Sequence, residues 1–149
     1  MTDPLEDFYE LIRTEMTVTL ATAADGRVTM RLVSPVYYQD SILIFTAGDS
    51  TKYQQLKSNP LCCIAAGSVF AEAAAEFCGP TTLPDNARLR DAYSAKFPDA
   101  FTEDVRFGGR NAEFIRLHPI RITGWTFEND VPAEDGIPTI PFEVVLPKP

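Results

Sequence analysis

The chain begins with apolar residues at helical spacing. Asp3 followed by Pro4 is typical of a helix start, because Asp caps the first free amides and Pro fits the first turn. The pattern predicts an N-terminal helix within residues 1–15, ending near Arg13 to Glu15. Its apolar face consists of Leu5, Phe8, Leu11 and Ile12.

From residue 16 the repeat changes to the alternation typical of β-strands. One strand is expected from Met16 to Ala21, and a second over residues 27–38. They flank Asp25-Gly26, a dipeptide that favours a tight hairpin turn. After another turn at Gln39-Asp40, residues 41–46 form a strand that is apolar on both faces. Further strands are expected over residues 61–66, 69–78 and 112–127, the last interrupted by Pro119.

Two further helices are expected between the strands. Ser50 can cap a short helix that runs through Lys57 and is stopped by Asn59-Pro60. Residues 85–97 carry a second apolar helical face.

Together these elements predict a mainly β protein, a six-stranded closed antiparallel barrel with helices over its ends. We divide the single domain, residues 1–149, into an N-terminal helix (1–15), a barrel with inserted helices (16–128) and a proline-rich acidic tail (129–149). The tail is expected to be extended, against a partner surface.

Composition excludes several classes of function. The chain has 149 residues, 45% of them hydrophobic, and a net charge of -8, with its surplus acids near the two ends. A nucleic-acid binder or a membrane-surface helix needs a dense basic stripe, and none exists, so we expect neither partner. The acidic N-terminal sequence contains no apolar signal core, which predicts a cytoplasmic protein.

The cysteines and the single histidine do not have metal-ligand spacing. Cys62, Cys63 and Cys78 form no CxxC pair, and His118 has no second histidine near it. We therefore expect no metal site and no disulfide, and interpret the cysteines as buried thiols in a reducing compartment.

The strand-to-helix junction at residues 45–52 is the leading candidate for a binding site. The first amides of a helix lack internal partners and favour an anion. Thr46, Ser50 and Thr51 add hydroxyl groups, and Lys52 adds a positive charge, so the junction has the groups of a phosphate site. The alternative is an ordinary turn in which Ser50 only caps the helix and Lys52 is solvated.

Arg31 is the second candidate, because it lies in the middle of a strand. A charge inside a barrel is costly unless it is paired. Arg31 either binds a planar ligand or a phosphate, or it points outward into solvent.

Other polar and aromatic residues have both a functional and a structural interpretation. Trp125 can stack on a planar ligand held by a partner subunit, or belong to a core or interface. His118 can transfer protons, although a structural role is the commoner one. We expect four further charged residues to lie on the solvated surface of the strands: Arg116, Arg121, Glu72 and Glu76.

Three short patterns, taken together, resemble the pyridoxamine 5'-phosphate oxidase family over roughly residues 5–128. They are Arg31-Leu-Val-Ser, then Phe45-Thr46-x3-Ser50-x-Lys52, then Leu56-x2-Asn59-Pro60. The resemblance implies an FMN-binding split barrel that forms a homodimer, with the flavin at the subunit interface.

The resemblance also implies a set of cofactor-binding residues. Arg31, Leu32, Val33 and Ser34 would line the flavin ring and ribityl chain, with Phe45 at the nearby strand end. Thr46, Ser50 and Lys52 would hold the phosphate, with Thr51 beside them, and Trp125 would cover the partner's flavin. The chain departs from the family's oxidases at Thr51, where they have an arginine, and at Val36, where they have a lysine.

The function that follows is an FMN-dependent oxidoreductase acting on a small-molecule substrate or electron donor. Neither the substrate nor a catalytic side chain is indicated, and a deazaflavin or haem is the alternative cofactor. A flavin carrier or sensor without turnover is the alternative function, and a purely structural dimeric barrel is a third.

Overall fold

The computed structural model describes residues 3–101, 111–126 and 140–147. Its helices are α1 (Pro4–Thr14), α2 (Thr51–Ser58) and α3 (Ala87–Lys96), and a 3-10 turn, η1, spans Pro84–Asn86. Its strands are β1 (Val18–Ala24), β2 (Arg27–Val33), β3 (Val36–Tyr38), β4 (Ser41–Ala47), β5 (Leu61–Ala66), β6 (Val69–Pro80), β7 (Ala112–Thr126) and β8 (Ile140–Val145).

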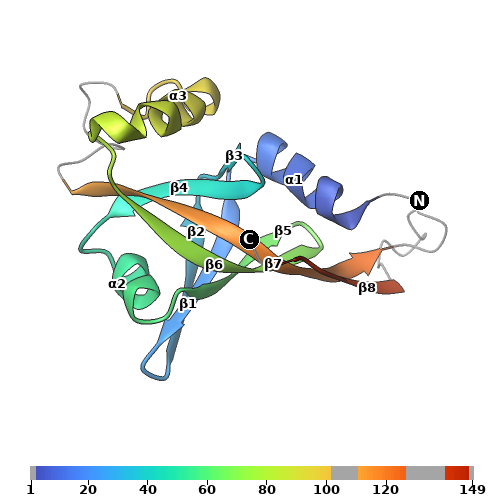
Figure 1. Ribbon diagram of the computed structural model, residues 1–149. Helices are drawn as coiled ribbons and strands as arrows, with labels where there is room; N and C mark the ends of the chain where they lie inside the picture. The colour runs from blue at the N-terminus through green and yellow to red at the C-terminus, as the bar shows by residue number, and fades with distance from the viewer. Residues whose placement is uncertain (1–2, 102–110, 127–139, 148–149) are drawn as a thin grey trace.

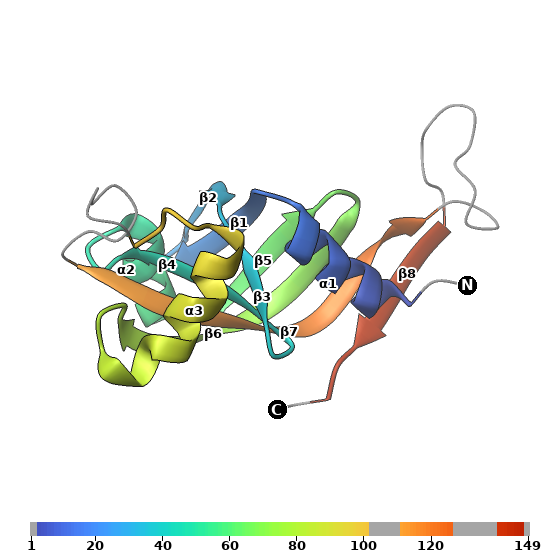
Figure 2. The same cartoon turned by 90° about the horizontal axis from the view of Figure 1, so that it is seen from above.

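The strands form one antiparallel sheet that curls on itself. Hydrogen-bonded neighbours follow the order β2-β1-β5-β6-β7-β4-β3, and β8 pairs with β7. Ser34 and Pro35 connect β2 to β3, the two ends of this order. In Figure 1, α1 and α3 lie above the sheet and α2 below its left end. Viewed from above, α1 and α3 cross in front of the strands (Figure 2).

The long strand β7 organises the sheet. Its first half pairs with β4 and its second half with β8, while β6 runs alongside most of its length. Pro119 does not interrupt it. Glu72 faces Arg121 and Ala73 faces Pro119, so Ile120 is an extra residue at a bulge, a place where a strand tolerates proline.

The predicted turns and helix start are confirmed. Asp25 and Gly26 have φ values of 53 and 78°, which is the geometry of a tight hairpin turn. Gln39 and Asp40 likewise have positive φ values. At the start of α1, Asp3 Oδ1 accepts hydrogen bonds from the first free amides of the helix.

Three sequence-based expectations need correction. Among the described residues, the sheet has eight strands rather than six. The expected strand over residues 27–38 is two strands, because Pro35 lacks an amide hydrogen; β2 pairs with β1, and β3 pairs with β4. The tail contributes β8 to this chain's own sheet. Its residues 129–139 and 148–149 lie outside the described residues.

The core has two parts. The larger lies within the curled sheet and includes Phe8 and Ile12 of α1 and Leu56 of α2. The smaller is aromatic and lies between α3 and strands β3, β4 and β7. The cysteines are free, as expected, but only Cys62 is buried; Cys63 is exposed on the outer face of β5, which corrects the expectation of three buried thiols.

Candidate functional site

Arg31 lies on the inner face of β2, near the end of the barrel that α2 covers. It is paired in register with Leu20, and its Nη1 donates to the Leu20 carbonyl at 3.2 Å. Nη1 also donates to Thr22 Oγ1 at 2.8 Å, and Nη2 donates to Thr29 Oγ1. These bonds occupy three of the five guanidinium N–H groups, so two remain for a ligand. The outward alternative for Arg31 is therefore wrong.

Gln55 connects α2 to this arginine. Its Oε1 accepts hydrogen bonds from Thr22 and Thr29, both at 2.6 Å, and its Nε2 donates to the Arg27 carbonyl at 3.2 Å. The same two threonines accept from Arg31, so one polar network fixes both the helix and the guanidinium. Sequence reasoning missed Gln55. The available signal was the two threonines, which face each other across the β1–β2 hairpin.

Lys52, in the first turn of α2, is the second positive charge of the site. It is partly buried, and burial, followed by the charge of Arg31, lowers the pKa of its amine. Within the described ranges, neither Lys52 nor Arg31 forms an ion pair with a carboxylate. Two neighbouring cations without a counter-charge are arranged as an anion would require.

Ser50 and Thr46 complete the junction between β4 and α2. Ser50 Oγ accepts the amide of Tyr53 at 3.2 Å, which confirms its capping role. Its hydroxyl also shares a hydrogen bond with Thr46 Oγ1 at 3.0 Å, and Thr46 is buried. Thr51 is exposed at the first position of the helix. The cap, together with Lys52 two residues later in the first turn, places hydroxyls and a charge at the positive end of α2.

The loop before α2 passes close to β7 at Gly48. A Cβ atom there would lie 2.8 Å from Glu113 Oε2 on β7. Burial, followed by the nearby Glu113 carboxylate, raises the pKa of the Tyr53 phenol. Close contact with β7 therefore fixes the path of the loop.

The segment predicted to contact the flavin ring also includes Leu32, Val33 and Ser34. Their side chains do not all point to the same face of the sheet. Leu32 points outward and is 66% exposed, whereas Val33 packs against the core. The Ser34 carbonyl accepts a hydrogen bond from the Tyr93 hydroxyl at 2.8 Å. What these positions share is the backbone of β2, which lies at the end of the pairing order and is paired only with β1 among the described strands. A planar ligand can bond to such an edge.

Phe45 and Trp125 lie away from the two cations within one chain. Phe45 packs in the aromatic cluster under α3, with its ring centroid 4.9 Å from that of Tyr93. Trp125 is 49% exposed near the end of β7 that pairs with β8, while the other end of β7 lies beside Thr46. These ends lie far apart in Figure 1. Within one chain, Trp125 is therefore remote from Thr46 and the start of α2.

The polar residues of β6 and β7 form surface pairs. His118 Nε2 lies 2.9 Å from Glu76 Oε1, and Arg116 lies 3.8 Å from the same oxygen. Arg121 bridges Glu72 and Glu143 at 3.1 and 2.7 Å. The expected surface reading of these charges is confirmed. No group of metal-ligating side chains occurs in the part of the chain that the structure describes.

One further surface is unusual for its apolar character. On the outer face of β2, Val28, Met30 and Leu32 are 74%, 69% and 66% exposed. Across the sheet this face continues through Ala21, Cys63 and Leu61. We call it the outer apolar face.

Solved structures with the same fold are numerous. A putative pyridoxamine 5'-phosphate oxidase from Listeria innocua is 11% identical with a TM-score of 0.64, covering 80% of this chain and 96% of its own. This is the pyridoxamine 5'-phosphate oxidase-like split-barrel fold. An FAD-binding protein from Mesorhizobium loti is 17% identical (TM-score 0.62; 81% and 92% covered). The heme storage protein HutZ from Vibrio cholerae is 16% identical (TM-score 0.68; 85% and 97% covered).

Sequence comparisons add nothing to this fold assignment. No family model matches the split-barrel chain, and no curated protein matches it in sequence. Among the described residues, none of the helices has the length and apolar character needed to cross a bilayer.

Proposed function

We propose that this split-barrel protein binds FMN and uses it as an oxidoreductase, with Arg31 and Lys52 holding the cofactor's phosphate. The observation that carries the proposal is the pair of neighbouring cations without a carboxylate partner among the described residues. A phosphate dianion would provide the missing counter-charge, and the two free N–H groups of Arg31 would donate to it.

The edge of β2 gives the flavin ring a place to bind. Residues 31–34 lead from Arg31 along this edge to Ser34, so a molecule anchored by its phosphate at Arg31 would lay its ring against the backbone. A flavin supplies the hydride chemistry when bound. The chain's own residues would anchor the phosphate, orient the ring and exclude water.

A second copy of the chain would complete the site. The outer apolar face begins on β2 itself, so a partner covering Met30 and Leu32 would also enclose a ring at the β2 edge. The partner's Trp125 would then be available to cover the ring.

The site favours a phosphate-bearing flavin over haem. The only histidine of the chain is His118, and its Nε2 bonds to Glu76 on the surface of the sheet, away from Arg31. Arg31, Lys52 and the hydroxyls at the start of α2 instead suit a phosphate.

Comparing FMN with riboflavin tests the phosphate assignment. A charge-assisted contact contributes about 1.5–3 kcal/mol, or roughly 10- to 100-fold in affinity. Lys52→Met should therefore weaken FMN binding at least about tenfold and leave riboflavin binding unchanged. The affinities are measured by quenching of flavin fluorescence.

The matched control is Lys57→Met in the same helix. Lys57 is exposed and lies over the Phe77 ring at 4.4 Å, away from Arg31, so its replacement should not change FMN binding. Equal losses in the two variants, or equal losses for FMN and riboflavin, would contradict the assignment of the phosphate to Lys52.

Turnover separates the oxidoreductase from a flavin carrier. If the bound flavin is reduced by a nicotinamide donor and reoxidised by an organic acceptor in repeated cycles, the protein is an enzyme. Stable FMN binding without turnover across a broad donor and acceptor panel would favour the carrier or sensor.

A further inference from the structure

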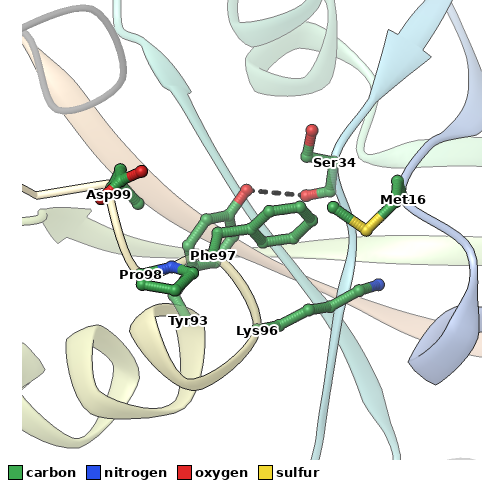
Figure 3. Close-up of a pocket in the computed structure, with 8 residues that line it drawn as sticks. Met16, Ser34, Tyr93, Lys96, Phe97, Pro98 and Asp99 are labelled. Carbon is green, nitrogen blue, oxygen red and sulfur yellow. Dashed lines mark hydrogen bonds between the residues drawn. The ribbon is translucent and has the colours of Figure 1, made fainter.

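A cavity of about 250 Å³ lies between the end of α3 and the connection from β2 to β3. Figure 3 shows its lining residues, with Met16 and Ser34 on one side and Pro98 and Asp99 on the other. None of the residues assigned above to the phosphate lines it. Ser34 lines it, and Ser34 also ends the segment predicted to contact the flavin ring.

The walls of the cavity are mainly apolar and aromatic. The Phe97 and Tyr93 ring centroids are 5.3 Å apart, and their planes differ by 31°. Met16 is 59% exposed, so its flexible thioether forms an adaptable wall at the opening. The Tyr93 hydroxyl already donates to the Ser34 carbonyl, as the dashed line in Figure 3 marks.

The lysine in the lining is not available to a ligand. Lys96 Nζ donates to the carbonyls of Ile12, Glu15 and Pro35 at 2.7, 2.6 and 2.7 Å. An ammonium group has three N–H donors, so all of them are used. Among the described residues that line it, the cavity therefore offers aromatic surface and no cation with an unused N–H donor.

We propose that this cavity binds a neutral planar aromatic molecule of one or two rings. A 150 Å³ apolar cavity holds benzene, so a volume of about 250 Å³ suits a molecule of naphthalene size. Because Ser34 links the cavity to the β2 edge, this molecule is the substrate of the flavin site. That last step rests on the proposed function, whereas binding of the ring does not.

Methyl NMR on the intact, flavin-free protein tests the proposal. The chain has three methionines, of which Met16 lines the cavity and Met30 lies on the outer apolar face. With the methionine methyl groups labelled with ¹³C, 2-naphthol should shift the Met16 signal in a saturable way and leave Met30 unchanged. A shift of Met30 without Met16, or no saturable shift, would overturn the proposal.

Charge discrimination tests the chemistry of the ligand. The anion 2-naphthoate has the same rings, and we expect it to bind at least about tenfold more weakly than 2-naphthol, because Lys96 has no free donor. Tighter binding of 2-naphthoate would show that Lys96 serves the ligand, and would overturn the assignment to neutral molecules.

A variant pair locates the ring. Phe97→Ala removes one wall and should weaken 2-naphthol binding about tenfold. Phe70→Ala removes a 42% exposed ring that does not line the cavity, and should have no effect. If the Phe97 variant does not fold, the Met16 titration of the unaltered protein still decides the proposal.

The two proposals fail separately. FMN binding without a 2-naphthol response at Met16 would remove the cavity proposal and leave the flavin site. A Met16 response without FMN binding would leave the aromatic cavity and remove the proposed function. Met16 shifts that are unchanged when FMN saturates the protein would support two distinct, compatible sites.

Discussion

Tyr93 is a buried phenol whose ionisation is coupled to folding. Burial raises its pKa above the ordinary value of 10, so the folded chain keeps a proton that the unfolded chain loses near pH 10. The free energy of unfolding must therefore fall as the pH rises above about 10. Tyr93→Phe should lose less stability between about pH 9 and about pH 11 than the unaltered protein. Urea unfolding of the two proteins at each pH measures these losses. Equal losses in the variant and the unaltered protein would contradict the role of Tyr93.

For single residues, the sequence predicts a role correctly when the contacts that determine it are close in sequence. Ser50 is an example, because a cap depends on neighbouring amides. The sequence could not predict the role of Gln55, because its hydrogen-bond partners are threonines of a hairpin more than 20 residues away. Nor did it separate Cys62 from Cys63. Adjacent residues of a strand face opposite sides, so one thiol is buried and the other exposed.

Among the elements, α2 is held by buried polar contacts as well as by its apolar face. Gln55→Leu would leave the buried Thr22 hydroxyl without this acceptor and the Arg27 carbonyl without this donor. We expect it to lower the free energy of unfolding by about 1–3 kcal/mol. Gln54→Leu is the control, because the exposed Gln54 side chain donates a single hydrogen bond, to the Gly48 carbonyl, among the described residues, so its loss should be below about 1 kcal/mol. Equal losses in urea unfolding would refute this view of α2.

Element boundaries follow from local chemistry where that chemistry is strong. The hairpin at Asp25-Gly26 and the strand over residues 61–66 were predictable from turn residues and apolar runs. The pairing of β3 with β4 required knowledge of where the chain goes after Pro35. Strand β8 was missed because it lies in a proline-rich segment, although Phe142 and Val144 alternate with the exposed Glu143.

For the whole molecule, the outer apolar face predicts association with a second copy. Met30→Glu would place a charge in the centre of that face and should convert a dimer to monomers in sedimentation experiments. Leu83→Glu is the control, because Leu83 is 40% exposed in the segment before α3 and outside that face. A monomeric unaltered protein, or dissociation in both variants, would contradict the proposed interface.

The central claim, that Arg31 and Lys52 hold the phosphate of a flavin, is tested most directly by titrating the unaltered protein with FMN and with riboflavin. The two ligands differ only in the phosphate. With two cations at the site, we predict that FMN binds roughly 100-fold more tightly than riboflavin, and that added salt reduces this preference. Equal affinities, or no binding of FMN, would contradict the claim.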